Sequence, residues 1–277
     1  MKIALTTLGC PNWDWDTICA RGREYGFDGV DMRGYLGAMD ITLMPEFTTG
    51  AGETRKKLED HGLVMSAISS SIRVCVAEQR EANIEEAKRT IDVAGKFDVK
   101  NVRVFGGGDL NKTPRAELAK IGCDCVEAIL QLDGASGIQW LFETHDIWVK
   151  GDDCRLLLEA IPNPNFGALW DIGHTPRVGG EAPEYTYNAM QGRVGYVHLK
   201  DAVYDPADPK VMQDGWVYRL PGQGALPLIE CLKLLHSKGY TGWIQFEHEK
   251  RWHPELQEPE EAFPAFVNWI RPVLASL

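Results

Sequence analysis

The chain has 277 residues, of which 44% are hydrophobic, so it can bury a large core in one large domain or in two smaller ones. Its formal net charge of −11 gives no electrostatic support to non-specific binding of nucleic acid or of an anionic membrane surface. No stretch reaches the roughly 18 consecutive apolar residues that a membrane helix requires. The composition therefore favours a small-molecule partner and predicts binding to neither nucleic acid nor a membrane.

The cysteines give no sign of a disulfide framework. There are seven, scattered through the chain, without a Cys-x-x-Cys pair that would suggest a thiolate zinc site. The first ten residues, MKIALTTLGC, end in a Gly-Cys pair as lipoprotein signals do, but their apolar stretch is too short for a signal. We interpret this segment as the first strand and expect a cytoplasmic protein.

Eight short apolar runs, rich in Val, Ile, Phe and Trp, recur along the chain. Each has the length of a strand, and their near-continuous hydrophobicity is typical of parallel strands that are covered on both faces. The runs comprise residues 2–9, 29–33, 64–71, 101–107, 139–145, 166–174, 194–202 and 242–249.

Segments with apolar residues at three- and four-residue steps separate these runs, among them 78–97, 115–132, 152–161 and 226–238. The alternation predicts an α/β protein with a (β/α)₈ TIM barrel in a single domain over residues 1–277, because such a barrel takes about 250 residues. An open doubly wound sheet is disfavoured, since the glycines at 106–108 lack the spacing that binds dinucleotide phosphates. We expect residues 204–224, rich in Pro, Asp and Gly, to form a long loop.

Each of the last four runs carries one polar residue near its end: Glu143, Asp171, His198 and Glu247. They are separated by 28, 27 and 49 positions. The first two separations match one strand–helix unit each, and the third matches one unit plus the long loop. Because chemistry in a TIM barrel gathers at the carboxyl ends of the strands, we expect all four side chains at one level of the barrel mouth.

These four residues predict a metal site. Three carboxylates that are buried together without a cation would cost several kcal/mol each. Together with the imidazole they form a mixed oxygen and nitrogen set that suits one divalent ion, with Mn²⁺ expected and Mg²⁺, Co²⁺ or Zn²⁺ as alternatives. A single acid at a strand end more often caps a helix or forms an ion pair, but four on consecutive strands favour coordination.

Two further residues follow this set closely. His174 lies three residues after the aspartate and Lys200 two residues after the histidine, so both are expected beside the ion and in contact with the substrate. The alternative for His174 is a hydrogen bond to a loop. The alternative for Lys200 is an ion pair with Glu143 or Asp201.

Other polar and aromatic residues have two interpretations each. His145 and Glu249 either contact a metal ligand and hold it in orientation or lie at the loop surface. Arginines near the early strands either contact an acidic substrate or, more often, form solvated ion pairs (Arg33, Arg73 and Arg103). The tryptophans after the first strand either line the pocket or pack in the core (Trp13 and Trp15).

On these motifs the chain resembles the sugar phosphate isomerase/epimerase family with xylose-isomerase-like barrels, along nearly its whole length. The matching motifs are FETHD, WDIGH, VHLKD, FEHE and the LPGQG turn before the seventh helix. The resemblance extends to ketohexose 3-epimerases, inosose dehydratases, hydroxypyruvate isomerases and endonuclease IV. It implies that the four strand-end residues bind the metal, that Glu143 and Glu247 move protons, and that His174 contacts a substrate oxygen. The epimerases carry an Arg where this chain has Tyr204, which departs from their pattern.

We therefore expect a divalent-metal-dependent isomerase or epimerase of a sugar or polyol-derived carbonyl compound, acting by carboxylate-mediated proton transfer through an enediolate. The alternative is a metal-dependent dehydratase or lyase on a keto-sugar or inosose, because the same site permits both outcomes. Remote alternatives are a non-catalytic sugar-binding barrel and a DNA-repair enzyme like endonuclease IV. The latter family uses three zinc ions and more histidines than the seven of this acidic chain. The expected partner is an unphosphorylated small carbohydrate, and the oligomeric state is left open, a homo-oligomer included.

Overall fold

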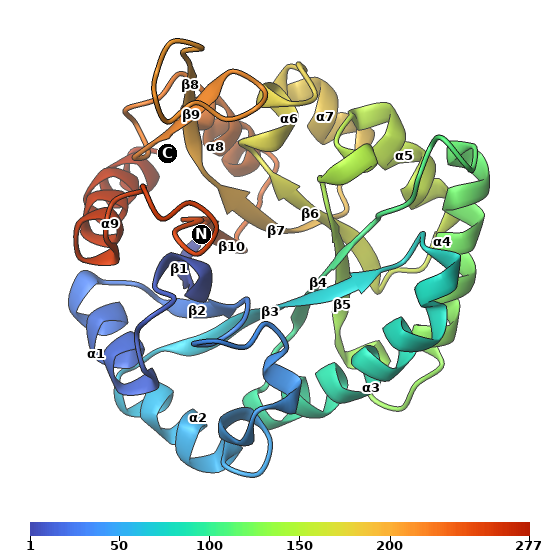
Figure 1. Ribbon diagram of the computed structural model, residues 1–277, viewed down its shortest axis with the longest axis horizontal. Helices are drawn as coiled ribbons and strands as arrows, with labels where there is room; N and C mark the ends of the chain where they lie inside the picture. The colour runs from blue at the N-terminus through green and yellow to red at the C-terminus, as the bar shows by residue number, and fades with distance from the viewer.

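The computed structural model describes residues 1–277 and contains eight parallel strands closed into a barrel (Figure 1). Around the barrel the strands follow the order β1-β10-β7-β6-β5-β4-β3-β2. Their bounds are β1 (Lys2–Thr6), β2 (Gly29–Met32), β3 (Val64–Arg73), β4 (Asn101–Phe105), β5 (Gln139–Glu143), β6 (Phe166–Asp171), β7 (Val194–Leu199) and β10 (Trp243–Phe246). The fold is a (β/α)₈ TIM barrel, which confirms the predicted fold class.

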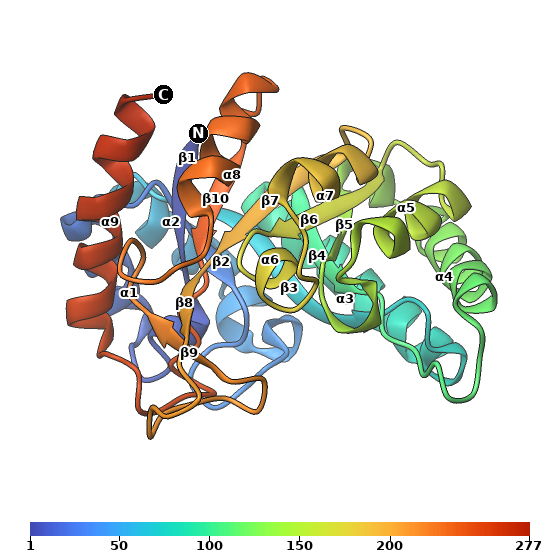
Figure 2. The same cartoon turned by 90° about the horizontal axis from the view of Figure 1, so that it is seen from above.

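Helices surround the barrel on its outer side (Figures 1 and 2). They are α1 (Trp15–Tyr25), α2 (Ala51–Asp60), α3 (Arg80–Phe97), α4 (Arg115–Leu130), α5 (Gly151–Ala160), α7 (Pro183–Ala189), α8 (Leu228–Ser237) and α9 (Pro259–Ala275). The short α6 (His174–Arg177) follows β6 directly, so the predicted strand over 166–174 is three residues too long. Six single 3-10 turns occupy the connecting loops. None of the helices combines the length and the apolar composition that a membrane-spanning segment needs.

Alternation along the strands decides which side chains enter the barrel. On β5 and β6, Trp140, Phe142 and Trp170 belong to the large core between the strands and the helices. Leu141 and Leu169 instead form a small apolar cluster with Ala67 and Tyr196 inside the barrel. Because successive side chains point to opposite faces, the residues two positions further along β5, β6 and β7 also point inward. The side chains of Glu143, Asp171 and His198 therefore enter the barrel interior near its mouth.

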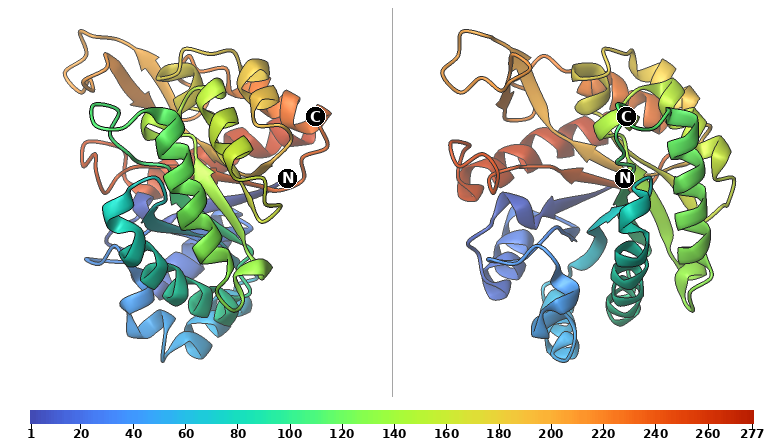
Figure 3. Two further views of the ribbon diagram at one scale, coloured as in Figure 1. Left: turned by 90° about the vertical axis from the view of Figure 1, so that its right-hand side faces the viewer. Right: turned by 45° about the vertical axis from the view of Figure 1, so that its right-hand side comes forward.

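A second, two-stranded sheet overlaps the segment that was expected to be a long loop. Strand β8 (Asp201–Tyr204) pairs antiparallel with β9 (Trp216–Arg219), and the hairpin stands out from the barrel (Figure 3). The Asp201 carboxylate closes its base, because it accepts hydrogen bonds from the backbone N–H groups of Gly222 and Gly224 at 2.8 and 2.9 Å. The prediction of a long loop over 204–224 was therefore wrong at β9 and at the last residue of β8.

The tryptophans after β1 pack in the helical layer. Trp13 meets the ring of Phe263 on α9 edge-on at 5.7 Å between ring centroids, and Trp15 meets Phe47 in the same way at 5.4 Å. The core-packing alternative is confirmed for both. All seven cysteines are free thiols.

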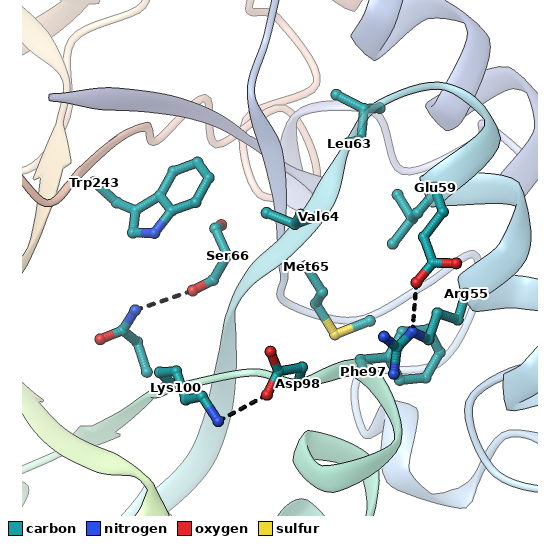
Figure 4. A pocket seen from close by; sticks show the side chains of 12 residues that line it. Arg55, Glu59, Leu63, Val64, Met65, Ser66, Phe97, Asp98, Lys100 and Trp243 are labelled. Atoms are coloured by element: carbon teal, nitrogen blue, oxygen red, sulfur yellow. Dashed lines mark hydrogen bonds and ion pairs between the residues drawn. The ribbon is translucent and has the colours of Figure 1, made fainter.

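A cavity of about 230 Å³ lies at the end of the barrel where the strands begin (Figure 4). Its polar groups are already paired with one another: Arg55 with Glu59, Lys100 with Asp98, and Asn101 with the backbone carbonyl of Ser66. Chemistry in TIM barrels takes place at the opposite face. This cavity therefore offers neither the position nor the free groups of an active site.

Candidate active site

The four strand-end residues converge at the barrel mouth. Glu143 and Asp171 are the last residues of β5 and β6, His198 lies next to the end of β7, and Glu247 directly follows β10. Asp171 and His198 are direct partners in the β6–β7 register. None of the four is more than 8% exposed. The structure thus brings together the residues that the sequence selected, and their role as metal ligands stays a prediction.

Within the cluster, one imidazole nitrogen stands between two glutamates. Nδ1 of His198 lies 3.1 Å from Oε1 of Glu247 and 3.4 Å from Oε1 of Glu143. A second, overlapping group combines Glu143, Asp171 and His174, in which Nδ1 of His174 lies 2.8 Å from Oδ2 of Asp171. In each group the ligand atoms lie within 4.8 Å of one another. His174 therefore occupies a position from which it could bind either substrate or metal.

The unsatisfied polar atoms of this cluster fit a divalent ion. Both ring nitrogens of His198 are buried without a hydrogen-bond partner, whereas Oδ2 of Asp171 and Oε2 of Glu247 form ion pairs with Lys200. Buried polar groups normally have such partners, so orphaned atoms in one place need an explanation. Ligands with bonds of roughly 2.0–2.2 Å to one ion stand about 3.0–3.5 Å apart, as the His198 and glutamate atoms do. Oxygen and nitrogen donors together suit Mn²⁺, Mg²⁺, Co²⁺ or Zn²⁺.

Lys200 crosses the mouth and joins three carboxylates. Its Nζ lies 2.6 Å from Glu247, 2.8 Å from Glu249 and 3.0 Å from Asp171. The stem has room because Gly173 lacks a side chain, and a Cβ there would stand 2.5 Å from Cγ of Lys200.

The ion pairs expected between Lys200 and Glu143 or Asp201 were predicted wrongly, because Lys200 pairs with neither residue. Glu143 faces Arg103 and His198 instead, and Asp201 turns away to hold the base of the hairpin.

Neighbouring charges determine the protonation states of Glu143, Asp171 and Lys200. Burial opposes ionisation of Glu143, yet its interaction with His198 and the charge of Arg103 hold its pKa below the usual range. Asp171 is likewise buried, and the charges of His174 and Lys200 hold its pKa well below the usual range. Burial would lower the pKa of Lys200, but Asp171 and Glu247 raise it well above its ordinary value. At neutral pH these two carboxylates are therefore ionised and the lysine is protonated.

Arg103 is a site residue that sequence reasoning misjudged. Its side chain is only 4% exposed, its Nε lies 3.4 Å from Oε2 of Glu143, and its guanidinium carbon is 3.9 Å from the centre of the Phe105 ring. The expected solvated ion pair is therefore wrong at this position. The signal was present, because Val102 and Val104 belong to the outer core and leave the residue between them facing inward.

The hairpin contributes a residue that no motif indicated. The hydroxyl of Tyr218 on β9 donates to Oε2 of Glu249 at 3.1 Å, and its ring lies 5.9 Å from Nζ of Lys200. Glu249 thus links the two residues, with Oε1 at the ammonium of Lys200 and Oε2 at the hydroxyl of Tyr218. His145 lies at the rim, where its ring meets His174 edge-on at 4.7 Å and its Nδ1 contacts Asp146.

Residues 19–273 match the family described as the xylose isomerase-like TIM barrel. The chain belongs to this family. Membership confirms the resemblance that the strand-end motifs suggested.

Curated relatives within the family match only part of the chain. An inosose dehydratase of Klebsiella pneumoniae subsp. pneumoniae is 35% identical over 114 residues, which cover 37% of each protein. An inosose dehydratase of Lacticaseibacillus casei is 26% identical over 140 residues, which cover 46% of this chain and 44% of that protein. The chain therefore matches less than half the length of these relatives.

Solved structures match along the whole chain at low identity. The IOLI protein with a bound zinc atom superposes with a TM-score of 0.81 at 17% identity over 100% of this chain and 99% of the other. D-psicose 3-epimerase of Clostridium cellulolyticum H10 with D-tagatose gives 0.76 at 12% over 99% of both. 3-Keto-D-glucoside 4-epimerase of E. coli gives 0.75 at 16% over 98% and 99%. At these identities the matches show a common fold.

Proposed function

We propose that this protein is a divalent-metal-dependent enzyme that removes a proton from the carbon next to a carbonyl group in a sugar-like substrate. The observation that carries the proposal is the arrangement of Glu143 and Glu247. Each directs one carboxylate oxygen to Nδ1 of His198 and the other to a cation, Arg103 or Lys200. Each glutamate can therefore offer one oxygen to an ion and keep the second for a proton.

Glu143, Asp171, His198 and Glu247 would hold the ion, for which we favour Mn²⁺. When bound, such an ion polarises a carbonyl and an adjacent hydroxyl, which acidifies the proton on the carbon between them. Ionised Glu143 would accept that proton. Protonated Lys200 would donate a hydrogen bond to the oxygen on which negative charge develops, and His174 would contact a substrate hydroxyl.

Two outcomes follow from this proton removal, and we place dehydration first. The curated relatives with detectable sequence similarity are named inosose dehydratases, whereas the epimerases share only the fold at 12–16% identity. Isomerisation or epimerisation, as expected from the sequence, is the second candidate. It is favoured by the two glutamates, which reach the same imidazole from strands that β6 and β7 separate and which could serve opposite faces of one substrate.

A substrate panel in D₂O tests this proposal. Inososes, ketohexoses and 3-keto-glycosides would be incubated with the Mn²⁺-loaded protein and followed by proton NMR, with EDTA-treated protein as the control. We expect an inosose to lose its proton next to the carbonyl together with a neighbouring hydroxyl. A deuterium-containing product with an inverted stereocentre or a moved carbonyl group, formed without loss of water, would support the second candidate. Absence of both exchange and product across the panel would contradict the proposal.

A further inference from the structure

Asp31 is a buried carboxylate beneath the metal-site cluster that the proposed chemistry does not use. It lies on β2, points into the barrel and is 0% exposed. Its Oδ1 accepts a hydrogen bond from the hydroxyl of Ser69 at 2.8 Å. Its Oδ2 has no hydrogen-bond partner and lies 3.7 Å from Nε2 of His198.

The two nitrogens of the His198 ring face different groups. Nδ1 faces the oxygens of Glu143 and Glu247 at 3.4 and 3.1 Å, whereas Nε2 faces Asp31. An imidazole that binds a metal through one nitrogen carries its proton on the other, and that N–H usually donates to a carboxylate, a carbonyl or water. The ring of His198 is therefore oriented so that Nδ1 is the metal-facing nitrogen and Nε2–H points at a carboxylate.

The surroundings of Asp31 leave His198 as its counterpart. The structure gives this carboxylate no ion-pair partner except His198. Ser69 donates a hydrogen bond to it, while Arg33 and Tyr196, whose hydroxyl is hydrogen-bonded to Ser66 at 2.8 Å, also lie near it without forming an ion pair. A buried anion with a single hydrogen bond is costly, and a second hydrogen bond from the imidazole would offset part of that cost.

We infer that Asp31 is a positioning residue for the metal site: a short approach from the present 3.7 Å between Nε2 and Oδ2 would let Asp31 accept the Nε2–H of His198, which would fix Nδ1 as the nitrogen that binds the ion. Asp31 itself contacts neither ion nor substrate. The inference rests on the proposed function, because it requires His198 to be a metal ligand.

Mn²⁺ titration by calorimetry on the metal-stripped protein tests this role. We expect Asp31→Ala to weaken Mn²⁺ binding about 10- to 100-fold, the range typical of losing the partner of a liganding histidine. Asp31→Asn keeps the volume and one acceptor oxygen, so it should weaken binding less. Ser66→Ala is the matched control, since it removes an interior hydroxyl that does not touch Asp31, and it should bind as the wild type does.

Nitrogen-15 NMR of the Zn²⁺-loaded wild-type protein gives a second readout that does not depend on activity. It should show zinc on Nδ1 and a proton on Nε2 of His198. Wild-type affinity in a folded Asp31→Ala protein, or zinc on Nε2, would overturn the inference while leaving the proposed function intact. If Asp31→Ala fails to fold, the nitrogen that binds zinc in the wild type decides, and zinc on Nε2 would overturn the inference. Equal Mn²⁺ affinity of the wild type and His198→Ala would overturn the proposed function, and this inference with it.

Discussion

Replacing Glu143 with Gln is expected to lower turnover by about 10²- to 10⁴-fold, the range that a missing general base costs. The carboxylate is ionised at neutral pH because His198 and Arg103 hold its pKa low. Gln keeps the volume and one oxygen that can face His198, but it cannot accept a proton. The variant should therefore retain bound metal while it loses both product formation and exchange of the substrate proton with D₂O.

Two variants bracket this prediction. Glu247→Gln should also lose turnover, and exchange without product in that variant would assign Glu247 to the return of the proton. Glu117→Gln makes the same chemical change at an exposed position on α4 and should leave turnover unchanged. Near-normal turnover of both active-site variants would contradict the two-carboxylate scheme and leave Lys200 as the group to test.

Replacing Lys200 with Met is expected to destabilise the metal-free protein by about 3–5 kcal/mol, the cost of leaving buried charges without their partner. Asp171, Glu247 and Glu249 all pair with this one ammonium, which is 2% exposed. For a protein of this size the loss corresponds to a melting temperature lower by roughly 5–9 °C. Mn²⁺ should reduce the difference in melting temperature between the variant and the wild type, because the ion would supply positive charge to the same carboxylates.

Calorimetric melting of the metal-free and Mn²⁺-loaded proteins measures this effect. Lys56→Met is the matched control, because Lys56 forms an ion pair with Asp60 on the exposed side of α2 and should change the melting temperature little. A metal-free Lys200→Met protein that melts with the wild type would show that the three carboxylates do not depend on the lysine.

The regular alternation of strand-like and helix-like segments predicted the barrel and the positions of the four strand-end residues. Near-continuous apolar runs at regular spacing define β5, β6 and β7, and Glu143 and Asp171 end two of them. In a closed parallel barrel, equal positions along neighbouring strands meet in space, so linear spacing was enough to place these residues together.

The spacing could not predict the contacts that long side chains make, nor those of the β8–β9 hairpin. Lys200 bridges from β7 toward residues of β6 and β10, and its choice of partners depends on where Asp201 turns. Tyr218 enters the site because residues 201–219 form a hairpin, which Pro, Asp and Gly in that segment obscured. Asp31 was missed because its importance lies in what it faces across the barrel, a relation between distant strands that no local pattern records.

Metal titration of the purified, metal-stripped protein tests whether the strand-end residues hold a divalent ion. Calorimetry with Mn²⁺ would be carried out on the wild type, His198→Ala and His174→Ala. We expect one ion per chain in the wild type, greatly weakened binding in His198→Ala, and unchanged stoichiometry in His174→Ala. A wild-type protein that binds no divalent ion, or a His198→Ala protein that binds it as tightly as the wild type does, would contradict a metal site at these residues.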